Sequence, residues 1–312
     1  MPHTCIHRWA SQPSPFRVPR YTWVLFKATR RCLIAVLHWL LIILSGVWLW
    51  SALTTWRGFT VLSVERGEPF LWRKGPQLAL FVREVSARTL CHVLSPLYWL
   101  HIPTPFGAES SNRPPVLLIP SAAYQKPALS FLATFLRSRG WRVAIASFKG
   151  RVDDLSERAK ELSSEVARLR EETGDPKVDL VAFSRGGLFA AWYCQHLDGQ
   201  SSTRRIVTLA TPWGGTRTAI FHRGSARREL RLGNPVLEHL VPPTVPTTCI
   251  WSTHDPHVVP PESSVAGHGV AAMEMEHGGH FELLFSARAY RSVETALILA
   301  PRPVAIRPDR KA

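Results

Sequence analysis

The sequence predicts an α/β protein, in which a mostly parallel sheet carries helices on both faces and a membrane-spanning helix precedes it. Three observations support this fold class. From residue 114 onward, short apolar runs alternate with longer amphipathic segments, as strands and helices do in such sheets. A serine stands where one apolar run gives way to a helical segment, and an uncharged apolar stretch lies near the N-terminus. A chain of 312 residues is long enough for one large domain and an appendage.

The chain is strongly basic, with 38 Lys and Arg against 23 Asp and Glu and a formal net charge of +15. Such charge suits nucleic acid or an anionic membrane surface. The sequence has no zinc-ligand spacing, RNA-binding signature or recognition-helix pattern, so we expect no nucleic-acid partner. An arginine-rich composition without functional meaning is an equally good interpretation of the charge. Nothing in the sequence indicates an oligomeric state.

The N-terminal region is interpreted as a basic tail, residues 1–32, followed by a transmembrane anchor, residues 33–53. Prolines in the tail argue against a long helix, and we expect it to be poorly ordered. The anchor contains no Lys, Arg, Asp or Glu and is about as long as a helix that crosses the hydrocarbon core of a bilayer. A secretory signal would have a shorter apolar region and a small-residue cleavage site, so we favour an uncleaved single-pass anchor.

Basic residues predict the orientation of this anchor. Six Lys and Arg residues precede the apolar stretch, and the nearest basic residue after it is Arg57. Because cytoplasmic flanks are enriched in Lys and Arg, we expect the tail in the cytoplasm and the larger domain outside it, in the periplasm of a bacterium. Arg66, Arg73 and Lys74 reduce this asymmetry, so the cytoplasmic side is kept as the alternative.

Residues 54–111 are interpreted as a juxtamembrane, amphipathic segment. Apolar residues recur at helical spacing over residues 77–100, which predicts a helix lying on the membrane or on the globular domain. Charged residues at what would be membrane depth disfavour a second span, and Pro96 is expected to end or kink the helix.

Residues 112–312 are interpreted as the α/β domain. The expected strands are 116–119, 141–148, 178–183, 206–210, 249–252 and 270–275. The expected helices are 128–139, 153–172, the segment after Ser184, and 281–299.

Ser184 stands at the junction between a strand and a helix. The run 178–183 is apolar except for Asp179, which is typical of a strand covered on both faces. A serine on such a turn has the geometry of a nucleophile elbow, where small residues two before and two after it relieve crowding. Ala182 and Gly186 occupy these positions, so the motif is A-x-S-x-G rather than G-x-S-x-G.

A serine hydroxyl needs a histidine base, and the histidine needs an acid that fixes its tautomer. On an elbow of this kind the chain order is serine, acid, histidine. Asp255 is the candidate acid, because it follows the end of the strand 249–252. An Asp before Pro is also a common turn former, and Asp198 and Glu262 are the rival acids.

His280 is the candidate base, because it follows the last strand and precedes the last helix. Gly278 and Gly279 would let the backbone turn sharply before it. His277 is the rival, and His254 and His257 are interpreted as loop residues. A zinc site built from these four histidines is conceivable, but no spacing is specific for one, and we expect neither a metal nor a cofactor.

An oxyanion hole requires two backbone N–H groups aimed at the developing charge. We expect one from Arg185, directly after the nucleophile. The second should come from the loop after the strand 116–119, with Ala122 as the first candidate and Ser121 as the next.

From about residue 114 to its end, the chain resembles the α/β-hydrolase superfamily, within its bacterial lipase and esterase branch. The matching stretches are VDLVAFSRGG (178–187), IVTLATPWGGT (206–216), STHDPHVVP (252–260) and GGHFELLFS (278–286). In the lipases that it resembles, the A-T-P-x-x-G-T segment begins a cap or lid, which would here be residues 217–245; a plain surface helix is an equal interpretation. Two departures are Ala182 in the elbow and Pro120-Ser121 in place of the usual His-Gly pair.

The resemblance and the residues together predict a serine hydrolase that cleaves carboxylic esters, acyl or lipid, through an acyl-enzyme at Ser184. An acyltransferase of the same fold would share that intermediate, and a non-catalytic, membrane-tethered lipid-binding member is a further alternative. The expected partners are an ester or lipid substrate and a membrane. The sequence does not indicate the acyl-chain length or the head group.

Overall fold

The computed structural model describes residues 20–68, 75–100, 113–122, 125–148, 154–240, 244–267 and 270–299. Within the first helix, side chains are described from Leu40 onward. The chain divides into two compact units, residues 1–46 and residues 47–312.

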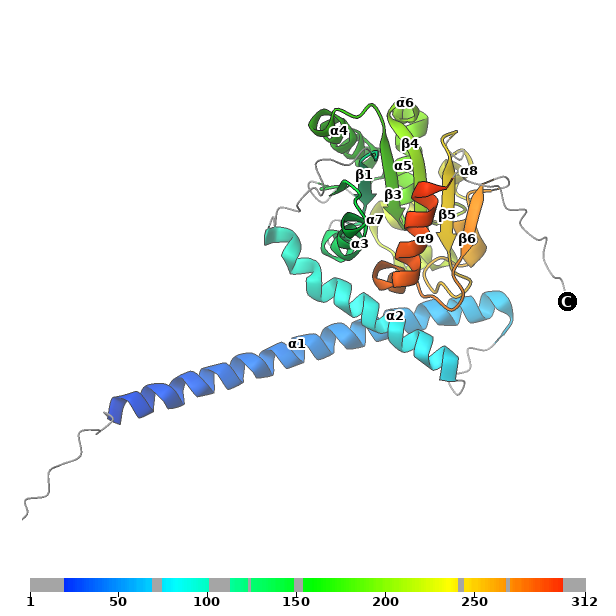
Figure 1. The fold of residues 1–312 in the computed structure, drawn as a ribbon. Helices are drawn as coiled ribbons and strands as arrows, with labels where there is room; N and C mark the ends of the chain where they lie inside the picture. Colours follow the sequence, from blue (N-terminus) through cyan, green and yellow to red (C-terminus); the bar gives the residue numbers. More distant parts are fainter. Residues whose placement is uncertain are drawn as a thin grey trace, which may run out of the picture. The chain divides into compact units, whose positions relative to one another are not determined.

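A six-stranded, fully parallel sheet forms the centre of the larger unit (Figure 1), with the strand order β2-β1-β3-β4-β5-β6. The strands are β1 (Val116–Ile119), β2 (Val143–Ile145), β3 (Val178–Phe183), β4 (Thr203–Leu209), β5 (Thr247–Trp251) and β6 (Ala271–Glu274). Every residue of β1 and β3 is buried, as the near-continuous apolar runs of parallel strands require. All six expected strands are therefore confirmed.

Helices cover both faces of the sheet. The main helices are α3 (Lys126–Ser138), α4 (Leu155–Thr173), α5 (Gly186–His196) and α9 (Ala287–Ile298). Shorter elements are η1 (Ser95–Leu100), α6 (Gly199–Ser202), η3 (Arg217–Phe221), α7 (Gly224–Glu229), α8 (Pro235–Glu238), η4 (Pro261–Ser264) and η5 (Phe281–Phe285). Successive residues of a strand point to opposite faces, so Leu117 packs with α4 and α5 in one core and Leu118 packs with α3 and α9 in the other.

Two of the expected elements have different lengths in the structure. The strand expected over 141–148 is only Val143–Ile145, because β2 is the edge strand and pairs with β1 alone. The helix expected over 281–299 is divided into η5 and α9. Ser286 separates them, and its hydroxyl accepts the N–H of Ala289, which starts a new helix.

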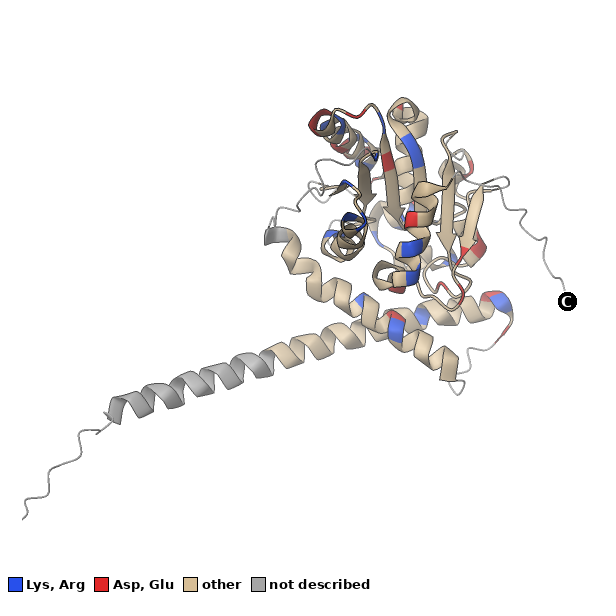
Figure 2. Ribbon diagram, viewed as in Figure 1, with Lys and Arg blue, Asp and Glu red and all other residues tan. Residues whose placement is uncertain are grey.

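The N-terminal helix α1 (Arg20–Arg66) is longer than the anchor predicted at 33–53. The expectation of a tail without a long helix is wrong from Arg20 onward, because Pro19 is the last proline before it and the helix starts directly after. The rest of the tail lies outside the described residues. Within the described part of the chain, Leu40–Arg66 is long and apolar enough to cross a membrane, and Figure 2 shows the few charges on it.

The C-terminal half of α1 also packs on the α/β domain. Residues on one helical face are buried, namely Ser51, Thr55, Gly58, Phe59 and Leu62. Phe59 and Leu62 form a small core with Leu80 and Val259. From Ser51 onward, one face of α1 is therefore packed against the α/β domain.

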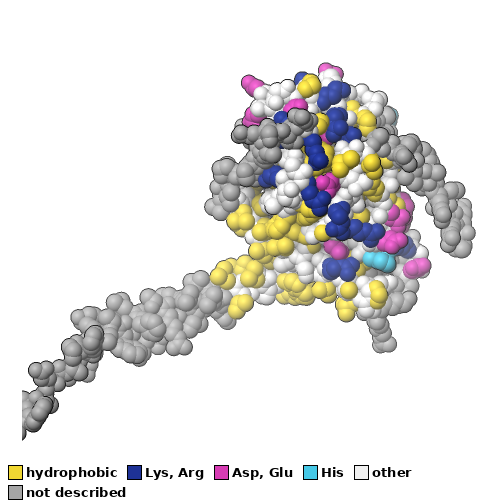
Figure 3. All heavy atoms as spheres, viewed as in Figure 1, with side chains coloured by type: hydrophobic (Ala, Val, Ile, Leu, Met, Phe, Trp, Pro, Cys, Tyr) yellow, Lys and Arg dark blue, Asp and Glu magenta, His cyan; other side chains and the backbone are white. Residues whose placement is uncertain are grey.

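The helix α2 (Gly75–Leu94) also packs on the domain, which was one of the two alternatives predicted for residues 77–100. It ends two residues before Pro96, where the sequence predicted a break. Its buried face carries Leu80, Glu84, Val85, Ala87 and Cys91. Its other face is apolar and exposed at Leu78, Val82, Leu90 and Val93, and Figure 3 shows hydrophobic side chains gathered over this part of the surface.

Candidate active site

Ser184 lies on a tight, strained turn between β3 and α5. Its φ is 54°, which is uncommon for a residue with a side chain. Close packing explains the two glycines that follow: a Cβ on Gly186 would lie 2.7 Å from the Ile119 carbonyl oxygen, and one on Gly187 would lie 2.2 Å from Thr211 Oγ1. The turn thus presents the Ser184 side chain at the carboxyl end of the sheet, where open α/β sheets place their sites.

Hydrogen bonds to β4 and to the loop after it hold the backbone of this turn. The N–H of Ser184 donates to the carbonyl of Leu209 at 2.7 Å. The Thr211 hydroxyl donates to the Ser184 carbonyl at 2.7 Å. Both partners belong to the segment that contains the A-T-P-x-x-G-T motif, so that motif supports the serine directly.

Asp255 lies in the loop after β5, and its carboxylate is completely buried. Its Oδ1 accepts the backbone N–H groups of His257 at 2.7 Å and Val258 at 2.9 Å. Its Oδ2 lies 2.7 Å from Nδ1 of His280. The two backbone bonds fix the carboxylate, which leaves the second oxygen directed at the imidazole.

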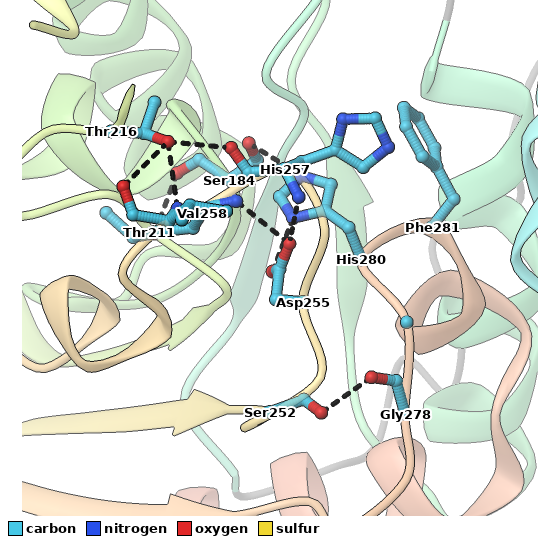
Figure 4. A network of polar contacts seen from close by, with 12 residues as sticks. Ser184, Thr211, Thr216, Ser252, Asp255, His257, Val258, Gly278, His280 and Phe281 are labelled. Carbon is cyan, nitrogen blue, oxygen red and sulfur yellow. Dashed lines mark hydrogen bonds and ion pairs between the residues drawn. The ribbon is translucent and has the colours of Figure 1, made fainter. Parts of the chain in front are cut away.

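His280 lies between Asp255 and Ser184 (Figure 4). Its Nε2 is 3.0 Å from the Ser184 hydroxyl, while its Nδ1 faces Asp255. The imidazole is 4% exposed and packs against Phe183 at 5.0 Å between ring centroids. Ser184, His280 and Asp255, which the sequence singled out, thus form one hydrogen-bonded chain. This geometry is the one that general-base activation of a serine requires.

The rival residues lie elsewhere. Asp198 precedes α6 and bonds to Ser201, and Glu262 lies in η4. His254 and His277 face each other at 5.0 Å between ring centroids, and burial lowers the pKa of His254 to about 4. Among the described residues, no group of three or more His, Cys, Asp or Glu is arranged to hold a metal ion.

The two candidate oxyanion donors, Arg185 and Ala122, line one cavity together with Ser184. The backbone N–H of Ala122, and that of Ser121, each donate to the buried Oε1 of Gln125 at 3.1 Å. Gln125 is a residue that the sequence reasoning missed. In this structure its amide oxygen accepts the N–H of Ala122, which is the group expected to bind the oxyanion of the substrate.

The cavity beside Ser184 has a volume of about 310 Å³. The segment 217–245 forms part of its wall through His222, Arg223, Ala226 and Leu230. A partly buried ion pair between Arg185 and Glu229 ties α7 to the turn of Ser184. None of the described residues that line the cavity is acidic, and Arg88 and Arg223 are among them.

The helix α2 also contributes to the site, which the sequence did not predict. Arg88 lines the cavity, and the buried Glu84 accepts the N–H groups of Phe281 and Glu282, which directly follow His280. Glu84 is one of the charged residues that, in the sequence, disfavour a second membrane span. The available signal was an acidic residue in the middle of an otherwise apolar helical face.

No protein-family model matches the chain. Among solved structures, it is similar to Aspergillus fumigatus lipase B, with 17% identity, 65% of this chain and 56% of that chain covered, and a TM-score of 0.55. The chain thus spans little more than half the length of that lipase. It is also similar to the mature form of Bacillus licheniformis lipase BlEst2, with 14% identity, 63% and 96% covered, and a TM-score of 0.52. These likenesses, together with the parallel sheet, show the α/β-hydrolase fold that the sequence motifs predicted.

Proposed function

We propose that this protein is a serine hydrolase that cleaves carboxylic esters through an acyl-enzyme on Ser184. The observation that carries the proposal is the continuous hydrogen-bonded chain from Ser184 through His280 to the buried Asp255, which opens on a cavity. Similarity in fold to two lipases supports an ester rather than another acyl compound as substrate.

In the acylation step, Ser184 Oγ attacks the ester carbonyl carbon while Nε2 of His280 takes its proton. Asp255 accepts the Nδ1–H bond, which fixes the tautomer and stabilises the imidazolium that forms. The carbonyl oxygen becomes negatively charged in the tetrahedral intermediate. When the intermediate collapses, the C–O bond to the alcohol breaks and His280 gives its proton to the leaving oxygen.

Deacylation repeats these steps with water. His280 removes a proton from a water molecule, which attacks the acyl carbon, and Ser184 leaves with the proton that His280 returns. The products are the free acid and the regenerated hydroxyl.

The backbone N–H groups of Arg185 and Ala122 are proposed to stabilise the oxyanion. Since the N–H of Ala122 donates to Gln125 Oε1 at 3.1 Å, the substrate oxygen must replace that amide oxygen. The exchange trades one neutral hydrogen bond for one to a developing charge, and charge-assisted bonds are about twice as strong. The interaction therefore favours the transition state over the ground state, as catalysis requires.

The cavity favours neutral or anionic esters over cationic ones, because Arg88, Arg223 and His222 line it and none of its described lining residues is acidic. We propose that the segment 217–245 is a cap over this cavity. The uncharged stretch of α1 before Ser51, within the anchor predicted at residues 33–53, is proposed to cross the membrane once, and the catalytic domain is proposed to lie in the periplasm. A C-terminal reporter active only in the periplasm tests this orientation, and a silent but stably expressed fusion would contradict it.

A fluorophosphonate probe tests the proposed chemistry, because it reacts with activated serines. The full-length protein in detergent should be labelled, and Ser184→Ala should abolish the label. Ser121→Ala is the matched control, since Ser121 also lines the cavity and keeps its backbone N–H in the variant. Equal labelling of the wild type and Ser184→Ala would contradict the proposal.

A further inference from the structure

A carboxylate from outside the sheet domain is buried beside the candidate triad. Glu84 is the one acidic residue in the sequence of α2, and its side chain is 0% exposed. Burial raises the pKa of this carboxyl group, while backbone hydrogen bonds from Phe281 and Glu282 oppose that rise. Because an isolated buried acid is destabilising, the contacts that compensate it indicate what it does.

These contacts join Glu84 to the turn that bears His280. Its Oε1 accepts the N–H of Phe281 at 2.9 Å, and its Oε2 accepts the N–H of Glu282 at 3.0 Å. Both N–H groups belong to the first residues of η5, for which His280 is the preceding residue. The first N–H groups of a helical turn have no partner within it, so Glu84 supplies what the turn itself lacks.

Glu84 occupies the space that a side chain at position 279 would need. A Cβ at this position would lie 2.2 Å from Glu84 Oε2. Gly278 and Gly279 were expected to let the backbone turn sharply before His280, but neither has a positive φ, and the left-handed residue in this stretch is His277, with a φ of 55°. The close approach of a carboxylate explains Gly279, and it indicates that the sequence at this turn accommodates a residue of α2.

Glu84 also reaches the loop that bears Asp255. His257 Nε2 lies 3.5 Å from Glu84 Oε1 and 3.2 Å from an Nη1 of Arg88. The backbone N–H of the same His257 donates to Asp255 Oδ1, and its ring lies 5.1 Å from the ring of His280. One side chain of α2 is thus in contact with the His280 turn and with the residue that holds Asp255.

We propose that Glu84 is a positioning residue, which holds the His280 imidazole in line between Ser184 Oγ and Asp255 Oδ2. The juxtamembrane helix α2 is then part of the catalytic apparatus as well as a connection to the anchor. This inference rests on the proposed function. Glu84 touches neither the substrate cavity nor the reacting atoms, and it acts through the backbone that follows His280.

Glu84→Gln is the sharpest perturbation, because it keeps the size of the side chain. The amide has one acceptor oxygen, so one of the two backbone N–H groups would face an NH₂ group. A displacement of His280 by about 1 Å costs on the order of 100-fold in rate. We therefore expect kcat to fall about 100-fold, with KM changed less than about twofold, since the cavity is retained.

Three controls separate positioning from loss of folded protein. Active-site titration with the fluorophosphonate counts the competent sites, so kcat is expressed per reactive serine. Glu294→Gln removes a carboxylate that pairs with Arg139 on the surface of the domain, and it should leave kcat unchanged. The low-field proton resonance of the His280–Asp255 hydrogen bond should be present in wild type and weakened or shifted in Glu84→Gln.

A double-mutant cycle tests the contact itself. Gly279→Ala should lower kcat in the wild type, because the new Cβ strikes Glu84 Oε2. The same substitution should cost less in a Glu84→Ala background, because the atoms at 2.2 Å and 2.7 Å are removed and only the Cβ of residue 84, at 3.0 Å, remains; the two effects are therefore non-additive.

The outcomes distinguish this inference from the proposed function. If wild type reacts with the probe, but Glu84→Gln keeps wild-type kcat per titrated site and an unchanged low-field resonance, the positioning role is overturned. A loss of titrated sites with unchanged kcat per site would likewise overturn it, in favour of a purely structural role. If wild type does not react with the probe at all, the proposed function itself is overturned, and the positioning role with it.

Discussion

Gly58 is the residue through which the C-terminal half of α1 approaches the loop bearing Asp255. A Cβ at this position would lie 2.2 Å from the Pro256 carbonyl oxygen and 3.0 Å from its carbon. Unlike the end of a side chain, a backbone carbonyl cannot rotate away. Gly58→Ala must therefore displace either the helix or the loop.

The size of the displacement follows from the contact distance. Ordinary contacts of a Cβ begin at 3.4 Å, so the atoms must separate by about 1.2 Å. If the loop takes this movement, the 2.7 Å bond between Asp255 and His280 lengthens past the ~3.2 Å limit of a good hydrogen bond. Misplacement of this size costs on the order of 100-fold in rate, and overpacking costs about 1–3 kcal/mol of stability.

The assay is kcat/KM for a p-nitrophenyl ester, with the full-length protein in detergent. Gly46→Ala is the matched control on the same helix, since a Cβ there would meet no described atom within 4 Å. We expect Gly58→Ala to lose about 100-fold in kcat/KM and Gly46→Ala to keep the wild-type value. Equal activity of the two variants would refute the argument that α1 supports the Asp255 loop.

Gln125→Glu should lower kcat/KM at least about tenfold, because a carboxylate would hold the N–H groups of Ser121 and Ala122 by charge-assisted bonds; activity equal to wild type would contradict this. Asp255→Asn should lower kcat about 10⁴-fold with an unchanged circular dichroism spectrum, since the amide cannot fix the tautomer of His280; a loss below about tenfold would exclude the assigned role. Burial and Arg88 lower the pKa of His257 well below 6.5, so the unfolded chain binds a proton that the folded chain does not. The contribution of His257 to the free energy of unfolding is therefore fully present above pH 6.5 and is lost as the pH drops below it. His257→Gln should make Tm fall less at acidic pH; equal pH dependence of Tm in the two proteins would count against it.

Much of the sheet could be predicted because its strands are buried on both faces. Runs such as Val116–Ile119 and Val178–Phe183 are wholly apolar or nearly so, and their spacing leaves room for helices between them. The residues of the hydrogen-bonded chain could be predicted as well, because each follows a strand and the chain order of an elbow hydrolase is fixed.

The contributions of α1 and α2 could not be predicted from periodicity. A helical face that contacts lipid and one that contacts a protein core are both apolar, so the sequence left both alternatives open for residues 77–100. Glu84 appeared as a charge that interrupts an apolar run, whereas its partners are backbone N–H groups almost 200 positions later in the chain. Backbone donors carry no sequence signal.

The contact of Gln125 with the oxyanion loop is local, yet it was also missed. A glutamine three residues after Ala122 fits a loop, a helix start or a substrate contact equally well. Only the orientation of the two N–H groups towards one amide oxygen identifies its role as an internal acceptor.

Direct detection of the acyl-enzyme tests the central claim. The full-length protein is mixed with a p-nitrophenyl ester, quenched in acid within the first turnover, digested and analysed by mass spectrometry. We expect one acyl group on the peptide that contains Ser184. In a His280→Ala variant that has been acylated with an activated ester, we expect a longer-lived adduct, because the base that activates water is missing. Enzymatic release of p-nitrophenol with no acyl group on Ser184, or with the acyl group on another residue, would contradict a reaction through an acyl-enzyme at Ser184.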